Sequence, residues 1–306
     1  MNEFEIIRHF FDDPYGEADL AIGDDAALIT PPANVPLAIA VDTLIEGKHF
    51  PPNTDAADVG YRALAVNLSD LAAMAATPKF YTLALTFPEF DQRWLADFSG
   101  AMHTLARQFG MQLIGGDTTR GPLSITVQVI GYQQRAALTR DGASAGDLIA
   151  VSGTLGDASV GLEFATGKAR AESHASFLQE RFLRPSPRIT LGGQLSGFAS
   201  AAIDVSDGLL ADVGHIAKAS GCRAVIDADG LPISASLSAV AGDERGRLAA
   251  LTGGDDYELC FTVPKDKSLA AFPECTVIGE MKEGDGVEVV NAPKSLEYGV
   301  DGYKHF

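Results

Sequence analysis

The sequence has little positive charge, few cysteines and no long apolar segment. It contains 23 lysines and arginines against 41 aspartates and glutamates, which gives a net charge of -18. Binding to a nucleic-acid backbone or an anionic membrane depends on clustered cations, so neither is expected as a partner. No apolar run approaches the length of a membrane span, and Met1-Asn2-Glu3-Phe4 is acidic, unlike a signal peptide. We therefore expect a soluble cytoplasmic protein.

The cysteine pattern and several missing motifs exclude further classes. Cys222, Cys260 and Cys275 are widely spaced without a Cys-x-x-Cys pair, which favours reduced thiols over a disulfide framework or a zinc site. The motifs G-x-G-x-x-G, H-R-D and H-E-x-x-H do not occur. Gly156 to Gly161 has the glycine spacing of a phosphate-binding loop, but Leu162 stands where its lysine would be. The common nucleotide-binding and zinc-protease frameworks are therefore absent.

The length and the apolar content predict two domains. A chain of 306 residues with 46% hydrophobic residues can build two cores of ordinary size. Composition changes between residues 133 and 147, so we assign residues 1–137 to an N-terminal domain and 138–306 to a C-terminal domain. Strands and helices alternate in both halves, which predicts a mixed β-α-β-α-β-β unit followed by an α/β domain.

Hydrophobic periodicity predicts the individual elements. The first half is expected to contain an apolar helical face at Phe4, Ile7, Phe10 and Phe11, a buried strand at 37–45, a helix at 56–76, a strand at 80–87, a helix at 91–109, and strands at 111–115 and 124–132. The second half is expected to contain strands at 148–152 and 201–205, a helix to about residue 166, a helix after the proline-rich loop 184–188, a helix with Ser206 as N-cap and Gly221 as its stop, a half-polar strand at 257–263, and last strands at Val277 and 287–290.

Aspartates recur beside glycine, serine or threonine. These short segments are Gly23-Asp24-Asp25, Val41-Asp42-Thr43, Gly115-Gly116-Asp117-Thr118 and Asp204-Val205-Ser206-Asp207-Gly208. Each aspartate taken alone suits a turn or a cap. Two carboxylates about 4 Å apart repel by about 4 kcal/mol at an effective dielectric near 20, so a cluster of them would need cations. Magnesium fits, because it is often held by one or two carboxylates plus substrate phosphates.

Asp70 belongs to the same pattern but lies inside the predicted long helix. It follows Asn67 by about one turn, on a stripe of otherwise small or apolar residues. Either Asp70 holds a ligand, or Ser69 or Asp70 caps a new helix.

The segment 115–121 carries the richest set of groups. It combines backbone amides, a carboxylate, two hydroxyls and a guanidinium, which suits a phosphate held through a metal on one side and donors on the other. The alternative is a polar hairpin loop. Arg140 could reach a phosphate or pair with Asp141, and His49 could contact a substrate or lie on the surface.

Together these segments resemble the thiamine-monophosphate kinases of the aminoimidazole ribonucleotide synthetase-like superfamily. The resemblance runs in order along the chain through the segments 23–28, 41–50, 65–74, 114–121, 202–209 and 253–259 and the closing residues 302–306. It implies a mixed α/β fold of two domains, with an N-terminal mixed sheet that pairs in a homodimer. It also implies Mg²⁺-dependent transfer of a phosphoryl group from ATP to thiamine monophosphate, directly and in line, to give thiamine diphosphate.

The resemblance also assigns roles to individual residues. Metal ligands would be Asp25, Val41, Asp42, Asp70, Asp117, Asp204 and Asp207; nucleotide contacts would be Gly116, Asp117, Arg140 and Ser206; substrate contacts would be His49, Asp255 and Tyr303. Asp70, Asp117 and Asp207 are expected to be catalytic. One departure is that Asp255 stands where the family usually has glutamate.

Two other functions stay open. Aminoimidazole ribonucleotide synthetase itself is a sister enzyme with a purine-precursor substrate, and a non-catalytic metal or nucleotide binder could keep the acidic segments. A selenophosphate synthetase is expected to carry a reactive cysteine near its N-terminus, and a hydrogenase-maturation dehydratase to end in one. Here the first cysteine is Cys222 and the last residues are His305-Phe306.

Overall fold

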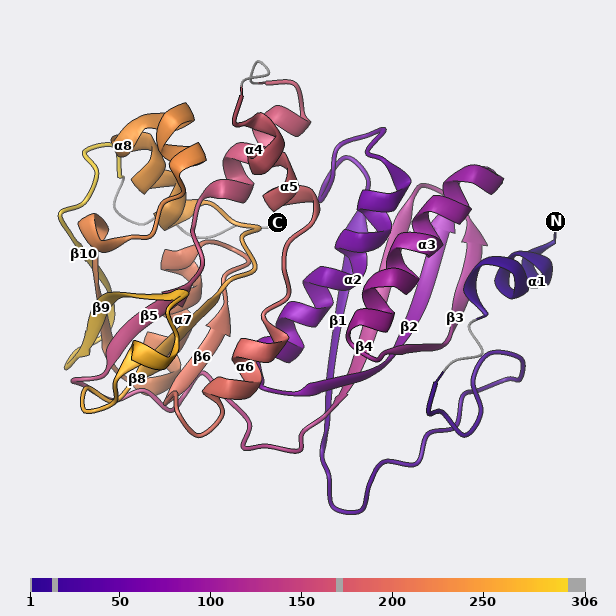
Figure 1. Ribbon diagram of the computed structural model, residues 1–306, viewed down its shortest axis with the longest axis horizontal. Helices are drawn as coiled ribbons and strands as arrows, with labels where there is room; N and C mark the ends of the chain where they lie inside the picture. The colour runs from indigo at the N-terminus through magenta and orange to yellow at the C-terminus, as the bar shows by residue number, and fades with distance from the viewer. Residues whose placement is uncertain (1, 13–15, 169–172, 297–306) are drawn as a thin grey trace. The chain divides into compact units, whose positions relative to one another are not determined.

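The computed structural model describes residues 2–12, 16–168 and 173–296, and it divides into two compact units (Figure 1). The first unit comprises residues 1–71 and 76–135, and the second comprises 72–75 and 136–306. Each unit builds its own β-sheet, with four strands in the first and six in the second. No helix among the described residues is long and apolar enough to cross a membrane.

The first unit is a four-stranded mixed sheet with helices. Its elements are α1 (Glu3–Ile6), the π-helical η1 (Ile7–Phe11), β1 (Leu37–Ile45), α2 (Ala56–Ala73), β2 (Thr77–Phe87), α3 (Gln92–Gln108), β3 (Gln112–Arg120) and β4 (Ser124–Tyr132). The strand order is β1-β4-β2-β3, with β2 and β3 parallel and the other pairs antiparallel. Figure 1 shows α2 and α3 lying along one face of this sheet.

Alternation along β4 shows which face forms the core. Ile125, Val127 and Val129 are fully buried, and a Cβ added on the same side at Gly131 would lie 3.3 Å from the side chain of Leu71 on α2. On α3, the ring of Trp94 stacks on that of Phe98, with 4.9 Å between the centroids.

The opposite face of the sheet is apolar and exposed along β1. Leu37, Ile39, Val41 and Ile45 point to this face and are 38%, 57%, 56% and 40% exposed. The prediction of a buried strand at 37–45 therefore has correct bounds but the wrong environment. The reason is that β1 is an edge strand with β4 as its neighbour in the sheet, and only its inner face is turned toward the helices.

The second unit contains a six-stranded mixed sheet and most of the helices. Its elements are β5 (Leu148–Ser152), α4 (Asp157–Ala165), α5 (Ala175–Leu183), α6 (Ile189–Leu195), β6 (Ala201–Asp204), α7 (Leu209–Ser220), β7 (Arg223–Asp227), the 3-10 turn η2 (Ala228–Gly230), α8 (Ala235–Thr252), β8 (Leu259–Val263), the 3-10 turn η3 (Leu269–Ala271), β9 (Cys275–Lys282) and β10 (Gly286–Val290). The strand order is β10-β7-β9-β5-β8-β6, and only β10 and β7 are parallel.

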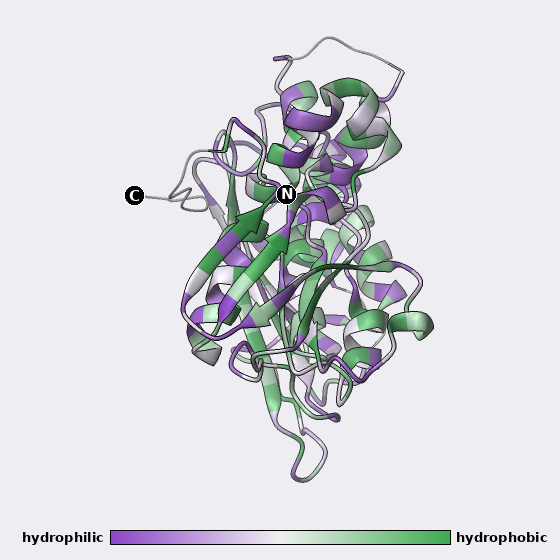
Figure 2. Ribbon diagram, turned by 90° about the vertical axis from the view of Figure 1, so that its left-hand side faces the viewer, coloured by the Kyte–Doolittle hydropathy of each residue, from purple (hydrophilic) through white to green (hydrophobic). Residues whose placement is uncertain are grey.

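Strands β5 and β8 of this sheet are almost entirely buried. All five residues of β8 are buried, so the expected half-polar strand at 257–263 is wrong in its burial and begins too early. Figure 2 shows the sheet strands as largely green bands interrupted by purple. All three cysteines lie in this unit, with Cys222 and Cys260 buried and Cys275 half-buried.

Several helix predictions also need correction. The long helix ends at Ala73 rather than at residue 76, because Ala75 adopts a left-handed conformation with φ of 58°. It runs without a break through Ser69, so no new helix is capped there. At the N-terminus Phe4 is 74% exposed and does not belong to the core, whereas Phe10 and Phe11 are buried.

Candidate active site

Strand β3 carries the glycine and aspartate residues of the segment 115–121. The expected strand at 111–115 continues to Arg120, so this segment is part of a strand rather than a hairpin loop. Gly116 pairs with Leu83 of the parallel strand β2. A Cβ at Gly116 would lie 1.8 Å from the carbonyl oxygen of Leu83, so only glycine fits this close approach.

A cavity of about 660 Å³ lies beside this strand within the first unit. It is bordered by α1 and η1, by residues 21–27, and by parts of β2 and β3. The cavity brings together three predicted site residues, Asp25, Gly116 and Asp117, although 92 positions separate Asp25 from Asp117 in the sequence. The side chain of Asp24 accepts a hydrogen bond from the amide of Asp25 at 2.8 Å, which orients this turn.

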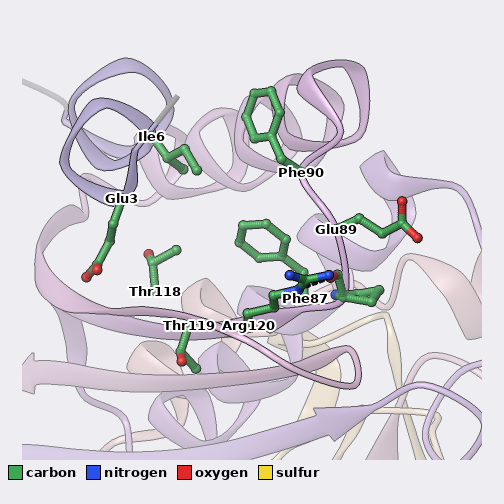
Figure 3. Close-up of a pocket in the computed structure, with 9 residues that line it drawn as sticks. Glu3, Ile6, Phe87, Glu89, Phe90, Thr118, Thr119 and Arg120 are labelled. Atoms are coloured by element: carbon green, nitrogen blue, oxygen red, sulfur yellow. Dashed lines mark hydrogen bonds between the residues drawn. The ribbon is translucent and has the colours of Figure 1, made fainter.

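A second cavity of about 490 Å³ shares Glu3 and Thr118 with the first (Figure 3). Its wall contains the rings of Phe87 and Phe90 and the guanidinium of Arg120. Nε of Arg120 donates to the carbonyl oxygen of Pro88 at 3.0 Å, which holds the side chain against the connection after β2. The two cavities together offer a carboxylate end and an aromatic end along one strand.

Asn67 connects β1 to α2 close to Asp42 and Asp70, which are both predicted metal ligands. Its side chain is fully buried, accepts a hydrogen bond from the amide of Asp42 at 2.9 Å and donates to the carbonyl of Ala63 at 2.9 Å. Asp70 follows one turn later on the same helix and is half-buried. Val41 has no donor atom in its side chain, so it could serve a metal only through its carbonyl oxygen.

The remaining candidates of the first unit lie after β1. His49 is half-buried, and its Nδ1 accepts a hydrogen bond from the amide of Ile45 at 3.0 Å. This contact fixes the ring close to the end of the strand.

The second unit presents its candidates on the turn between β6 and α7. Asp204 ends β6 and is buried, whereas Ser206 and Asp207 are half-buried. The N-cap of α7 is Gly208, with φ of 111°, and not Ser206 as predicted. Gly221 ends the helix in a left-handed conformation, as predicted.

Asp212 supports this turn and was missed in the sequence. Its buried Oδ2 accepts hydrogen bonds from the amides of Ser206 and Asp207 at 3.0 and 3.1 Å. Desolvation, together with the nearby charge of Asp204, raises the pKa of Asp212 to about 7. The sequence signal was an acid among the apolar residues of a helix, next to Val213.

The raised pKa of Asp212 predicts a pH dependence of stability. Between its ordinary value of 3.8 and about 7, the folded chain binds this proton more tightly than the unfolded chain. The free energy of unfolding should therefore fall as the pH rises through this window, and Asp212→Asn should flatten that slope. Urea unfolding at several pH values, with EDTA present to exclude metal ions, measures the slope. An equal slope in the variant would contradict the assignment.

Two other candidates of the second unit lie on neighbouring segments. Asp255 is half-buried, and its amide donates to the carbonyl of Ser206 at 2.8 Å, which puts it beside the turn. Arg140 is exposed, and Asp141 accepts a hydrogen bond from Thr139 at 2.5 Å. Tyr303 lies outside the described residues.

The predicted carboxylates are therefore only partly brought together. Asp25 and Asp117 share a cavity, and Asp204 and Asp207 lie on one turn of the other unit. Among the residues that the structure describes, no three histidine, cysteine, aspartate or glutamate side chains are grouped so as to hold a metal ion. The available donors are nevertheless hard oxygen atoms, the kind that magnesium prefers.

Comparison with known proteins agrees with the two units. Residues 23–133 match the family model of the AIR synthase related protein, N-terminal domain, and residues 144–291 match that of the C-terminal domain. The fold and these matches define a two-domain protein of the AIR synthase related class. The chain is 46% identical to thiamine-monophosphate kinase of Salmonella typhimurium over 99% of this chain and 98% of the relative. It belongs to the thiamine-monophosphate kinase family.

Solved structures give the same relationship. The crystal structure of thiamine-monophosphate kinase from Stenotrophomonas maltophilia is 49% identical, with a TM-score of 0.85 over 90% of this chain and 92% of that one. The structure of AaThiL complexed with AMPPCP and TMP is 34% identical, with a TM-score of 0.83 over 94% of this chain and 92% of that one. The predicted two-domain mixed α/β fold is thereby confirmed.

Proposed function

We propose that this chain transfers the γ-phosphoryl group of ATP to thiamine monophosphate, forming thiamine diphosphate and ADP. It is related over its whole length to thiamine-monophosphate kinases, and its relative AaThiL was solved in complex with AMPPCP and TMP. In this chain the proposal is supported by the cavity that gathers Asp25, Asp117 and the glycines of β3.

The reaction needs alignment and charge neutralisation more than proton transfer. A phosphate oxygen of thiamine monophosphate attacks the γ-phosphorus of ATP, a new P–O bond forms, and the bond to the β,γ-bridging oxygen breaks as ADP leaves. The attacking oxygen is already ionised near neutral pH, so no general base is required. We propose a direct in-line transfer without a phosphoenzyme, which follows the general pattern of phosphoryl transfer.

Several Mg²⁺ ions are proposed as the counter-charges. Asp25, Asp42, Asp70 and Asp117 of the first unit would be ligands, as would Asp204 and Asp207 of the second, and Asp70, Asp117 and Asp207 are the proposed catalytic residues. Bound Mg²⁺ neutralises phosphate charge and orients phosphate oxygens.

The chain's own backbone and side chains would position the two substrates. Gly116, Arg140 and Ser206 would contact the nucleotide. The cavity with Phe87 and Phe90 offers aromatic walls to the rest of the nucleotide. His49 and Asp255 would contact thiamine monophosphate, with the carboxylate facing its cationic ring system.

The direct test is product formation. Purified chain, ATP, Mg²⁺ and thiamine monophosphate should yield thiamine diphosphate and ADP in equal amounts, measured by chromatography. Product from aminoimidazole ribonucleotide precursors instead would favour the sister enzyme. Tight binding of ATP and Mg²⁺ without ADP formation would favour a non-catalytic binding protein.

The exposed face of β1 supports a homodimer. Ile39, which is 57% exposed, lies opposite Ile130 of β4 on an apolar stripe at the sheet edge. Exposed apolar stripes of this kind are typical of protein interfaces. We propose that a second copy of the chain covers this face.

A charge on this stripe should separate the dimer. Ile39→Glu should shift the molar mass in light scattering from two chains to one, because a carboxylate would be buried without a partner. Val277→Glu, at an exposed valine of β9 in the other unit, is the matched control and should leave the mass unchanged. A wild-type chain that is monomeric at all concentrations would overturn the proposal.

The cellular location is also a proposal. All three cysteines are free thiols in the structure, which suits a reducing compartment. We therefore place the chain in the cytoplasm.

A further inference from the structure

The segment after α8 has an unusual backbone. Asp255 and Tyr257 have positive φ angles of 70° and 50°, although neither is a glycine. Residues with side chains rarely adopt such angles, and these conformations persist only where the surroundings hold them. Contacts with neighbouring residues must therefore hold Asp255 and Tyr257 in these conformations.

The backbone of the segment is tied to the turn that carries Ser206. The amides of Asp255 and Tyr257 donate to the carbonyls of Ser206 and Val205, both at 2.8 Å. In return the amide of Val205 donates to the carbonyl of Glu258 at 2.8 Å. These three hydrogen bonds hold the backbone of the segment against the turn.

Two buried carboxylates alternate with the two strained residues. Asp256 is fully buried, and its oxygens accept hydrogen bonds from the amides of Gly156 and Ala158 at 2.6 and 3.2 Å, at the start of α4. Burial raises the pKa of Asp256 to about 8, and these two donors offset part of the cost of its charge. This carboxylate anchors the middle of the segment.

Glu258 anchors the end of the segment. It is fully buried and accepts hydrogen bonds from Nε and Nη2 of Arg188 at 2.6 and 2.5 Å, from Arg181 at 2.9 Å and from Ser152 at 2.5 Å. The hydroxyl of Ser152 in turn accepts a hydrogen bond from the amide of Leu259 at 2.9 Å. Charge-assisted bonds of this kind are short and directional, so they fix the glutamate in one orientation.

We propose that Asp256 and Glu258 are positioning residues, which hold Asp255 and Tyr257 in left-handed conformations and so aim the Asp255 carboxylate at the thiamine substrate. The inference rests on the proposed function, because it gives Asp255 a substrate to contact. Asp256 and Glu258 themselves are fully buried, so we assign them no contact with either substrate. Their effect on the reaction passes through Asp255.

The proposal predicts a selective loss of substrate affinity. Asp256→Asn keeps the shape of the side chain but turns an NH₂ group toward one of the two amide donors. We expect the KM for thiamine monophosphate to rise about 10- to 100-fold, by analogy with the loss caused by removing a residue that orients a metal ligand. The KM for ATP should change less than about twofold, whereas general damage to the fold would affect both.

A double-mutant cycle separates positioning from general damage. In an Asp255→Ala background the Asp256→Asn change should no longer raise the KM for thiamine monophosphate, because the group that it orients is gone. Glu258→Gln serves for the same cycle if Asp256→Asn does not fold. The matched control is Glu163→Gln on α4, which removes a salt bridge to Arg245 of α8 at the protein surface. It should leave both KM values unchanged.

The outcomes distinguish the two proposals. A wild-type chain that makes no thiamine diphosphate would overturn the proposed function and this inference with it. An active wild type in which the effects of Asp255→Ala and Asp256→Asn simply multiply would overturn the positioning role alone.

Discussion

Replacing Asp117 by asparagine is expected to lower kcat/KM for thiamine diphosphate formation by about 100- to 1,000-fold, the loss typical of removing one preorganised charge contact to a transition state. The substitution keeps the size of the side chain and removes one negative charge from the cavity that Asp117 shares with Asp25. The apparent affinity for Mg²⁺ should fall as well, because a hard anionic ligand becomes a neutral one. Initial rates measured across a range of Mg²⁺ concentrations test both effects.

The control for this substitution is another aspartate of the same unit. Asp97 on α3 is 54% exposed and lies 3.8 Å from Arg93, a surface pair of little energetic weight. Asp97→Asn should retain full activity. Wild-type activity in Asp117→Asn at every Mg²⁺ concentration would remove Asp117 from the proposed mechanism.

Opposite stability changes are expected when two helical glycines of the first unit are replaced by alanine. A Cβ at Gly60 of α2 would lie 2.2 Å from the carbonyl oxygen of Phe98 on α3, and backbone atoms cannot rotate out of the way. Gly60→Ala should therefore force the helices apart and lower the free energy of unfolding by about 1–3 kcal/mol. At Gly100 of α3 nothing lies within 4 Å of an added Cβ. Gly100→Ala should therefore raise the free energy of unfolding by about 0.5–1 kcal/mol.

Urea unfolding followed by circular dichroism measures both changes as shifts of the midpoint. The comparison is sharp because both residues are glycines within helices, and both changes add the same methyl group. A midpoint for Gly60→Ala equal to or above that of the wild type would show that α2 and α3 can move apart without cost.

Local patterns predicted the elements whose sequence alone decides their extent. The strands 124–132 and 148–152 have the predicted bounds, because their apolar residues are interrupted at both ends by polar and glycine residues. Gly221 ends α7 because a left-handed residue there satisfies the last carbonyl groups of the helix. Such signals lie within a few residues of their effect.

Strand pairing explains why β3 was predicted too short. The run Gly115 to Arg120 has the composition of a turn, but parallel pairing with β2 keeps it extended as far as Arg120. Neighbouring strands also decide burial: the aliphatic pattern of 37–45 is that of a buried strand, and only the sheet order shows that β1 is at the edge. The strand 223–227 and the helix 235–252 went unpredicted.

The predicted site residues were assigned from the family resemblance. The residues that hold them in place were found only in the structure. Asp256 accepts its hydrogen bond from Gly156 across 100 positions of the chain, and Glu258 accepts one from Arg181 across 77. No local pattern can indicate partners at such separations. The residues that orient a site are for this reason harder to read from a sequence than those that line it.

The distribution of the reporter side chains has a practical consequence. The sole tryptophan, Trp94, is stacked on Phe98 in the first unit, so its fluorescence follows the unfolding of that unit. All the thiols belong to the second unit, and Cys260, fully buried on β8, can react with a labelling reagent only after that sheet opens. Fluorescence and thiol labelling along one denaturant series would therefore reveal whether the two units unfold in one cooperative step or in two.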